Sequence, residues 1–218
     1  MKIAVFDLDR TLIRGDSLHH FLAFMVREYP GSLVRGWHLP LAYAAHKLGA
    51  RDNEWLKTTF LFALFGRMQR QTLLESSARF AKQLLPQVRP AAVEQLKEHR
   101  KLGHYTVLAT ASPDFYVEPL TSFVEFDEVI CTKSRWSRHG TFDGLDGGNC
   151  YGEQKFQRVE EARARLGDAA LSAMYTDHRS DEALLAAAEA AYLVNPDRRT
   201  EQSVVFEGLQ ILDWDRVT

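Results

Sequence analysis

Three short segments with the character of buried strands end directly in acidic or hydroxyl-bearing residues, and this pattern limits the folds open to the chain. The segments 3–6, 105–109 and 171–175 are followed at once by Asp7, by Thr110, and by Thr176 and Asp177. Apolar runs of this length are typical of strands buried on both faces of a parallel sheet. Helical stretches separate the segments. The sequence therefore predicts an α/β protein with a doubly wound parallel sheet.

A long helical region separates the first two predicted strands. Four helices are expected there: one capped by Asp16 or Ser17 and ending at Pro30-Gly31, one over 32–48 with a kink at Pro40, one from Asp52 to Gly66, and one that starts at the capping box Thr72-x-x-Glu75 and ends near Pro86. Beyond it we expect helices over 90–103, 114–123, 153–166 and 181–189, strands over 128–131 and 192–194, and a hairpin or flap over 135–148. The simplest organisation is a core formed by 1–14 and 86–218 that carries a helical cap over 15–85.

The formal charges divide along the same line. The whole chain has 27 Lys and Arg and 29 Asp and Glu, a net charge of −2, which argues against a bulk nucleic-acid binder. The 17–100 region is nevertheless basic and the remainder acidic. The two cysteines, Cys131 and Cys150, cannot form a disulfide framework and favour a reducing compartment. Since the N-terminus also lacks the pattern of a signal peptide, we expect a cytoplasmic protein, with contact at the inner face of the membrane left open.

The polar residues at the strand ends have the chemistry of one site. In open α/β sheets, sites form outside the carboxyl ends of the strands. Asp7, Asp9 and Thr11 follow the first strand, Thr110 and Ser112 the second, and Asp177 and Asp181 a later one, while Lys155 opens the helix before it. Four carboxylates gathered in one place need a compensating charge. A hard cation such as Mg²⁺, which takes oxygen ligands, together with a phosphate group, is the natural partner.

These residue types also suit phosphoryl transfer. One of the carboxylates Asp7 and Asp9, expected on the same side of an extended strand, can attack phosphorus while the other transfers a proton. Lys155 and Thr110 can hold the phosphoryl oxygens.

The motifs resemble those of the haloacid dehalogenase superfamily, in particular its phosphoserine-phosphatase-like subfamily. The resemblance rests on Phe-Asp-Leu-Asp-Arg-Thr-Leu over 6–12, Thr-Ala-Ser over 110–112, the Lys155 segment and Tyr-Thr-Asp-His-Arg-Ser-Asp over 175–181, which occur in the order of that family. It implies an Mg²⁺-dependent phosphomonoesterase with a helical cap. Asp7 would be the nucleophile and Asp9 the acid and base. The metal ligands would be the Asp7 carboxylate, the Asp9 backbone carbonyl and Asp177.

The resemblance implies further roles and shows two departures. Asp181 and Thr11 would support the site, and Asp16 stands where phosphoserine phosphatases have a substrate-facing Glu. His178 replaces the usual Ser of the fourth motif, and Arg10 replaces the more common Gly beside the nucleophile, so both are candidate substrate contacts. Thr110 and Ser112 compete for the hydroxyl that binds phosphate, with Thr110 favoured. The cap and the Gly-rich segment before Lys155 are closer to a phosphatidylglycerophosphatase branch.

Ordinary structural roles compete with these functional ones. The aspartates can be helix caps, Lys155 a solvated helix residue, Cys150 a buried thiol, and the aromatic run Phe60, Phe62 and Phe65 helix packing. Three functions remain open. The first is a phosphatase for a small anionic metabolite of the phosphoserine kind. The second is a lipid phosphate phosphatase at a membrane surface, and the third is a catalytically weak binding or regulatory protein. The sequence leaves the oligomeric state undetermined.

Overall fold

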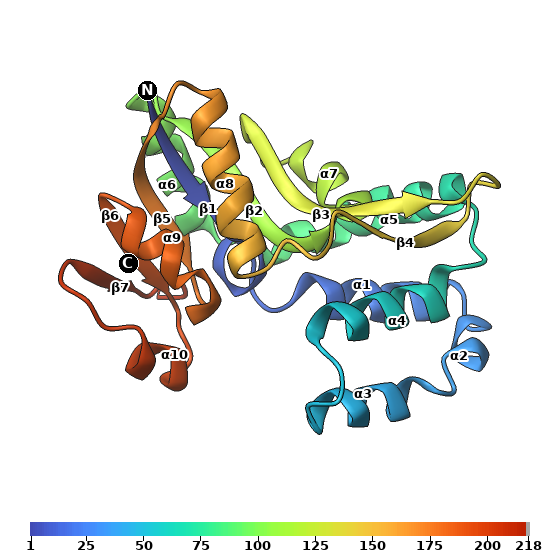
Figure 1. Cartoon of the computed structure of the whole chain (residues 1–218). Coiled ribbons are helices and arrows are strands. Elements are labelled where there is room, and N and C mark those ends of the chain that lie inside the picture. The colour runs from blue at the N-terminus through green and yellow to red at the C-terminus, as the bar shows by residue number, and fades with distance from the viewer. Residues whose placement is uncertain (217–218) are drawn as a thin grey trace.

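A seven-stranded sheet forms the centre of the molecule (Figure 1). The computed structural model describes residues 1–216. The strand order is β4-β3-β2-β1-β5-β6-β7, and every pairing is parallel except that of β3 with β4. The strands are β1 (Lys2–Phe6), β2 (Tyr105–Pro113), β3 (Glu128–Trp136), β4 (Phe142–Asp146), β5 (Ala170–Thr176), β6 (Ala190–Val194) and β7 (Leu209–Leu212). The predicted doubly wound α/β fold is confirmed.

The apolar run of β1 explains why helices cover both faces of this sheet. Successive side chains of a strand point to opposite faces, so Ile3 and Val5 enter one hydrophobic cluster while Ala4 and Phe6 enter the other. The first cluster includes side chains of α8 (Glu153–Arg165) and α9 (Glu182–Ala187). The second includes α6 (Pro90–Lys101) and α7 (Asp114–Thr121). The remaining C-terminal helix is α10 (Arg198–Ser203).

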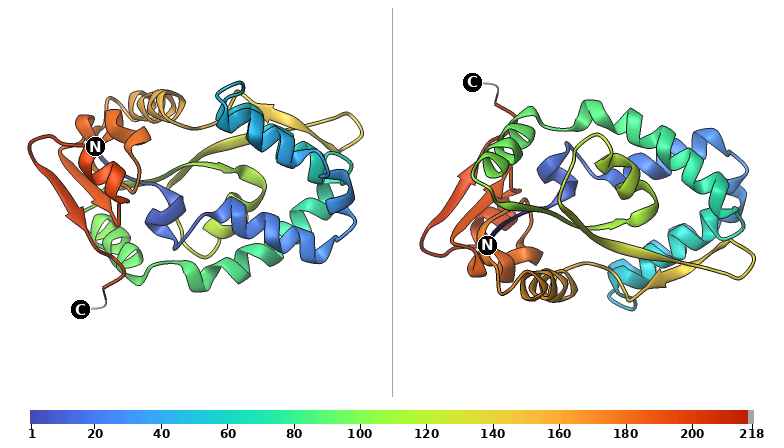
Figure 2. Two further views of the ribbon diagram at one scale, coloured as in Figure 1. Left: turned by 90° about the horizontal axis from the view of Figure 1, so that it is seen from below. Right: turned by 90° about the horizontal axis from the view of Figure 1, so that it is seen from above.

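Five helices lie within residues 15–85, where the sequence predicts a cap of four helices. They are α1 (Ser17–Glu28), α2 (Ser32–Arg35), α3 (Leu39–Lys47), α4 (Asn53–Phe65) and α5 (Arg70–Leu84). Asp16 caps α1 by accepting from the backbone N–H of His19 at 2.9 Å, and Asp52 caps α4 by accepting from Trp55 at 2.7 Å. Figure 2 shows α1 and α4 on opposite sides of the cap. The domain boundary at 15–85 stays a prediction.

An aromatic cluster joins the cap helices to the core. Phe21 of α1 has ring contacts with Phe65 of α4, Phe80 of α5 and both Phe115 and Tyr116 of α7, with centroids 4.8–5.5 Å apart. Aromatic pairs at these separations contribute beyond their buried area. The base of the cap is therefore packed onto the core as one hydrophobic unit.

Several expected elements differ from the structure. The helix predicted over 32–48 is two helices, because Gly36 to His38 leave the helical path and Pro40 occupies the first turn of α3. The capping box at Thr72 is wrong, since α5 already begins at Arg70. The strands β2 and β3 run beyond their predicted ends, and α10 and β7 were not predicted. Within residues 1–216, no helix has both the length and the apolar character needed to span a membrane.

Candidate active site

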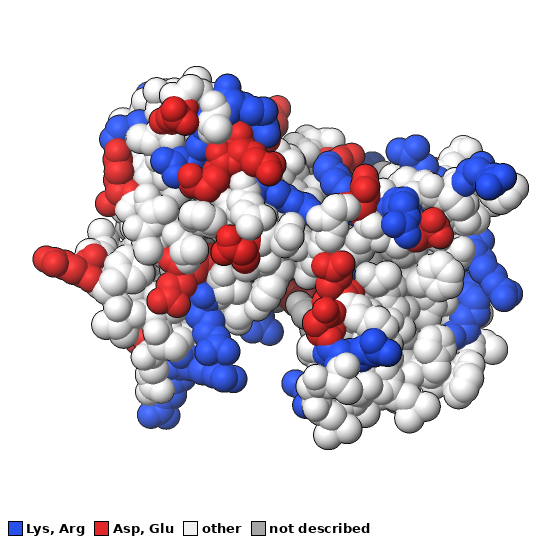
Figure 3. Space-filling view, viewed as in Figure 1, with Lys and Arg blue, Asp and Glu red and all other residues white. Residues whose placement is uncertain are grey.

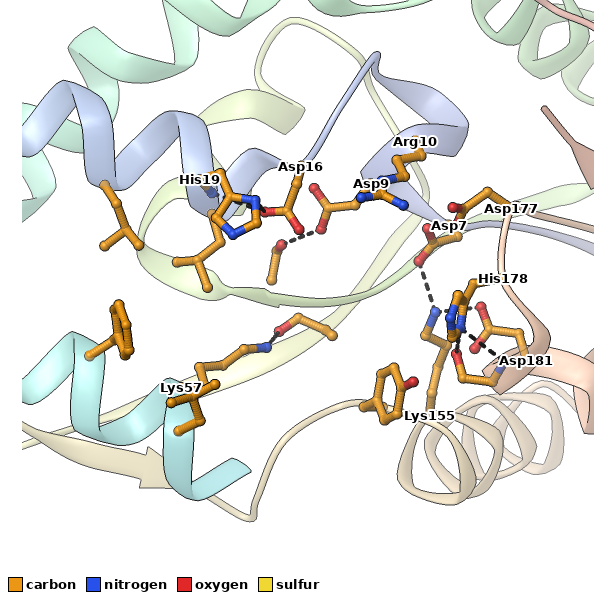
Figure 4. Close-up of a pocket in the computed structure, with 18 of the residues that line it drawn as sticks. Asp7, Asp9, Arg10, Asp16, His19, Lys57, Lys155, Asp177, His178 and Asp181 are labelled. Atoms are coloured by element: carbon orange, nitrogen blue, oxygen red, sulfur yellow. Dashed lines mark hydrogen bonds and ion pairs between the residues drawn. The ribbon is translucent and has the colours of Figure 1, made fainter. Parts of the chain in front are cut away.

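A pocket of about 410 Å³ lies between the carboxyl ends of the strands and the cap (Figure 4). Parallel strands bring their carboxyl ends to the same edge of the sheet, which is why distant parts of the sequence meet here. The core contributes one half of the lining, which is mostly polar and is called the core half. Helices α1, α3 and α4 contribute the other half, which is called the cap half. The lining includes most of the predicted site residues, namely Asp7, Asp9, Arg10, Asp16, Ser112, Lys155, Asp177, His178 and Asp181.

Lys155 is the centre of a buried ionic cluster. Its Nζ donates to Asp7 Oδ1 at 2.8 Å and to Asp181 Oδ2 at 2.7 Å, and the lysine is only 3 % exposed. Thr176 Oγ1 also donates to Asp181 Oδ2, at 2.8 Å. Burial disfavours the charge of Lys155, but Asp181 and Asp7 raise its pKa above the ordinary value, so the lysine keeps its positive charge. The structure thus brings Asp7, Lys155 and Asp181 together, as the motif order predicts.

Asp7 and Asp177 in the pocket have raised pKa values. Burial raises the pKa of Asp7 to about 8; Lys155 opposes this shift, while the neighbouring carboxylates add to it. Burial also raises the pKa of Asp177 to about 7, with Arg10 opposing and Asp181 adding. Raised values of this kind mean that the charged form of both carboxylates is costly here, first because they are buried and then because other carboxylates lie close by.

The donor set fits a magnesium ion better than a transition metal. In the described residues, no three His, Cys, Asp or Glu side chains are arranged around one point as ligands. Mg²⁺ does not require such a group, because it usually binds through one or two carboxylates with water and substrate phosphate. Asp7 and Asp177 both line the pocket, and the charge of Asp177 contributes to the raised pKa of Asp7. Their oxygen donors therefore fit the expected ion.

Asp9 faces a different set of partners from Asp7. Its carboxylate accepts from the Ser17 backbone N–H at the start of α1 and from Ser112 Oγ, the latter at 2.7 Å. Burial raises its pKa, and Asp16 adds to the shift. The expected extended strand through both aspartates is wrong, because β1 ends at Phe6 and the chain then makes a turn over η1 (Leu8–Leu12), in which Asp9 is extended and Arg10 is left-handed. Asp9 nevertheless lines the same pocket as Asp7.

The turn after β1 explains the positions of Arg10 and Thr11. Arg10 adopts a left-handed backbone conformation with φ of 59°, and its exposed side chain lines the pocket beside Asp177. A non-glycine residue in this region is uncommon, and such strain often accompanies functional sites. Thr11 is fully buried outside the pocket, and its hydroxyl has no hydrogen-bond partner among residues 1–216. Its expected supporting role stays a prediction.

The structure separates the two hydroxyl candidates. Thr110 Oγ1 accepts from the Ser112 backbone N–H at 3.0 Å and is not part of the pocket lining. Ser112 lines the pocket, donates to Asp9, and lies 2.8 Å from Ser17 Oγ. In this conformation the hydroxyl that faces the pocket is therefore that of Ser112, although Thr110 was favoured.

Asp16 and His178 reach the pocket while also stabilising local structure. Asp16 caps α1 and lies 3.5 Å from the ring of His19. His178 accepts from the Ser180 backbone N–H at 3.1 Å, and burial lowers its pKa. Both the capping role and the pocket position that the sequence left open for Asp16 are therefore present.

Sequence reasoning missed the cap half of the pocket. Lys57 of α4 lines it and donates to Ala111 O and to Asn149 Oδ1, each at 2.7 Å. Burial lowers the pKa of Lys57 to about 8. Phe60 also lines the pocket, Phe65 is buried in the aromatic cluster, and Phe62 is 55 % exposed, so the aromatic run does not have a single role. The spacing of Leu56 and Phe60 was the available signal, but it equally suits helix packing.

Comparison with known proteins places this fold and site in a family. A sequence model of the haloacid dehalogenase-like hydrolases matches residues 4–186. The chain belongs to this family. The predicted superfamily is confirmed, and so is the predicted enzyme class, a phosphatase of that superfamily.

Individual relatives cover nearly the whole chain. The chain is 25 % identical to a histidinol-phosphatase of Neisseria meningitidis, over 98 % of this chain and 99 % of that protein. Among solved structures, a protein of unknown function from Bordetella pertussis superposes with a TM-score of 0.83 at 23 % identity and covers 98 % of each chain. A substrate-bound phosphoserine phosphatase superposes with a TM-score of 0.69 at 13 % identity, over 96 % of this chain and 92 % of that one. At these identities, the likeness to the two solved structures shows a shared fold.

Proposed function

We propose that the chain is an Mg²⁺-dependent phosphomonoesterase that forms an aspartyl-phosphate on Asp7. The observation that carries the proposal is the buried cluster in which Lys155 joins Asp7 and Asp181 at the strand ends, next to Asp177. The carboxylates Asp7 and Asp177 and the backbone carbonyl of Asp9 would hold the ion. When bound, it supplies positive charge for the phosphoryl oxygens and lowers the charge cost of the carboxylates.

The remaining chemistry belongs to side chains of the pocket. An Asp7 oxygen attacks phosphorus, and the bond from phosphorus to the substrate oxygen breaks. Asp9, whose burial raises its pKa and so favours its acid form, donates a proton to that oxygen. Asp9 then takes a proton from the water that hydrolyses the aspartyl-phosphate. Lys155 stays charged beside Asp7 and offsets negative charge that develops on the phosphoryl group.

Replacing Asp7 by Asn tests the proposal. With 4-nitrophenyl phosphate and Mg²⁺, we expect D7N to lose at least about 10³-fold in kcat, because an amide cannot act as the nucleophile. D143N, on the exposed hairpin where Asp143 pairs with Arg135, is the matched control and keeps wild-type turnover. Near wild-type turnover by D7N would exclude the aspartyl-phosphate. Absence of turnover by the wild-type protein on any phosphate ester would instead favour the binding or regulatory alternative.

The first substrate class to test is small phosphorylated metabolites. A relative named histidinol-phosphatase and a fold neighbour named phosphoserine phosphatase both have names that point to small phosphate esters. We propose that this chain acts on a small phosphate ester of this kind, with Arg10, Asp16, Ser112 and His178 as its contacts at the pocket wall.

A second candidate is a lipid phosphate at the inner face of a membrane. Residues 29–51 contain no acidic residue, and several of their large apolar side chains are exposed, with Trp37 at 75 % and Leu48 at 85 %. Figure 3 shows this lower part of the cap as a largely uncharged surface with Lys and Arg beside it. Such a surface suits an anionic bilayer. Flotation with anionic and neutral liposomes tests it: absence of binding to anionic liposomes at low salt would remove this candidate.

A further inference from the structure

The cap half of the pocket is lined mainly by apolar side chains. Leu18 and Leu22 come from α1, Leu56 and Phe60 from α4, and Tyr43 from α3. Each of the first two pairs is spaced by four residues, so both members lie on the same face of their helix. Figure 4 shows α1 and α4 on either side of this part of the pocket, away from the ionic cluster.

These apolar faces are only partly covered by the protein itself. Leu18, Leu22, Leu56 and Phe60 are all half-buried. Leu18, Leu22 and Phe60 pack against the buried cluster that contains Phe21, and their remaining surface is exposed. Apolar side chains that line a concave site and remain partly exposed are typical of a wall that contacts the organic part of a ligand. The neighbouring Phe62, on the same helix, does not line this pocket.

The two halves of the pocket therefore differ in the chemistry that they can recognise. The core half has carboxylates, Lys155 and Arg10, which suit a cation and a phosphate group. The part of the cap half next to the core has Asp16, His19 and Lys57, which can contact polar atoms close to the phosphate ester. The rest of the cap half offers only apolar and aromatic surface and the Tyr43 hydroxyl. A substrate consisting of a phosphate on a short polar alcohol would leave this part in contact with water.

We infer that the substrate is a phosphate monoester whose alcohol carries an apolar body, aliphatic or aromatic, that lies between α1 and α4. The inference rests on the proposed phosphatase function and specifies its substrate class. Phe60 and Leu22 are the specificity-determining residues, because they face the body from opposite helices. Burial of one methylene contributes about 0.8 kcal/mol, which corresponds to about fourfold in kcat/KM.

A series of n-alkyl phosphates tests the inference. We expect kcat/KM with Mg²⁺ to rise about threefold to fourfold for each methylene from ethyl to hexyl phosphate. A flat profile with measurable turnover of ethyl phosphate would overturn the inference and leave the phosphatase proposal intact. If neither the series nor 4-nitrophenyl phosphate is hydrolysed, it is the proposed function that fails.

Longer and aromatic substrates identify the kind of apolar body that the pocket accepts. 3-Phenylpropyl phosphate measures the fit of a compact ring, and dodecyl phosphate, below its micelle concentration, measures the fit of a lipid-like chain. A maximum at the phenylpropyl or hexyl compound supports a closed apolar compartment. A further rise to dodecyl phosphate supports a groove that is open at its far end. A preference for ethyl phosphate over both would overturn the inference.

Variants on the two faces of α4 provide the matched control. We expect F60A to reduce the ratio of kcat/KM for hexyl over ethyl phosphate by about tenfold, because the ring contact is lost. Phe62 is the same residue type on the same helix but is 55 % exposed outside the pocket, so F62A leaves that ratio unchanged. L22A on α1 repeats the test on the opposite wall. Turnover of ethyl phosphate by each variant reports that its core is folded, and an unchanged ratio in both F60A and L22A would overturn the inference.

Discussion

The pocket contains a lysine in each half, and the two differ in what surrounds them. Lys155 of the core lies between the carboxylates of Asp7 and Asp181. Burial opposes its charge, but the two aspartates outweigh that cost and raise its pKa. Among the described residues, Lys57 of the cap donates to the neutral oxygens of Ala111 and Asn149 alone, and burial lowers its pKa to about 8. The positive charge is therefore fixed in the core half and conditional on pH in the cap half.

This difference indicates that the two halves of the pocket have different roles. A charge that is always present suits the phosphoryl group, whose negative charge is present in every substrate of the class. A lysine held by neutral acceptors can change partners without leaving a buried anion unpaired. The core half is therefore suited to the proposed phosphoryl transfer, and the cap half to the choice of substrate.

Loss of the core lysine gives the largest expected effect. K155A should lower kcat by about 10²- to 10³-fold, because one preorganised positive partner of the phosphoryl group is removed. It should also destabilise the metal-free protein, since Asp7 and Asp181 are left without their cation. Steady-state kinetics and thermal unfolding measure the two effects. Lys47, which is exposed on α3, supplies the control K47A; equal effects of both variants on kcat would show that Lys155 has no special role.

The two hydroxyl candidates come next in size. S112A should lower kcat about tenfold to a hundredfold, because Ser112 faces the pocket and donates to Asp9. T110A should have the smaller effect, since the Thr110 hydroxyl is not part of the pocket lining and accepts from the Ser112 backbone N–H. Kinetics of both variants with one substrate decide between them. A larger loss in T110A would mean that the turn at 110–112 rearranges when phosphate binds.

The core half of the pocket could be predicted from the sequence because its residues follow strands. Asp7 and Asp177 come directly after buried strands, and parallel pairing brings strand ends to one edge whatever the details of packing. Lys155 was found by its place in the motif order. The turn through η1, by contrast, depends on a left-handed Arg10 that no propensity indicates. Its consequence, that Asp9 faces Ser17 and Ser112, could therefore not be read from the spacing of the aspartates.

The cap half could not be predicted because most of its residues lie on helices. Helix faces are assigned by packing, and Phe60, Phe62 and Phe65 look alike in the sequence although one faces the pocket, one is exposed and one is buried. Only the rotation of α4 against its neighbours decides which face becomes the wall of the pocket. Periodicity indicates that a helix has two faces, but it does not say what each face contacts.

Loss of the cap lysine should have a smaller effect than loss of Lys155. K57M is expected to raise KM about tenfold with little change in kcat, because Lys57 can contact an anionic substrate without taking part in bond breaking. Since its pKa is about 8, the wild-type KM should rise above that pH as the ammonium loses its proton. K57R, whose guanidinium stays charged, should keep a low KM at pH 9. A KM of K57M with the same pH dependence as the wild type would exclude this role.

The stability of the metal-free protein gives the smallest and most specific comparison of the halves. Burial raises the folded-state pKa of Asp7 to about 8 and of Asp177 to about 7, well above the ordinary carboxyl value. A group with a raised folded pKa stabilises the folded state at low pH, and this contribution is lost as the pH rises toward the folded pKa. Without metal, the melting temperature should therefore fall by a few degrees between pH 5.5 and 8.

Magnesium should reverse this loss, because it binds the carboxylates in their charged form. The rise in melting temperature on adding Mg²⁺ is expected to be small at pH 5.5 and larger at pH 8, and both differences should shrink in D177N, which has one titrating carboxylate fewer. F60A, altered only in the cap half, should show the same dependence on pH and Mg²⁺ as the wild type. A stabilisation by Mg²⁺ that is equal at both pH values would mean that the ion binds without displacing protons, and so away from Asp7 and Asp177.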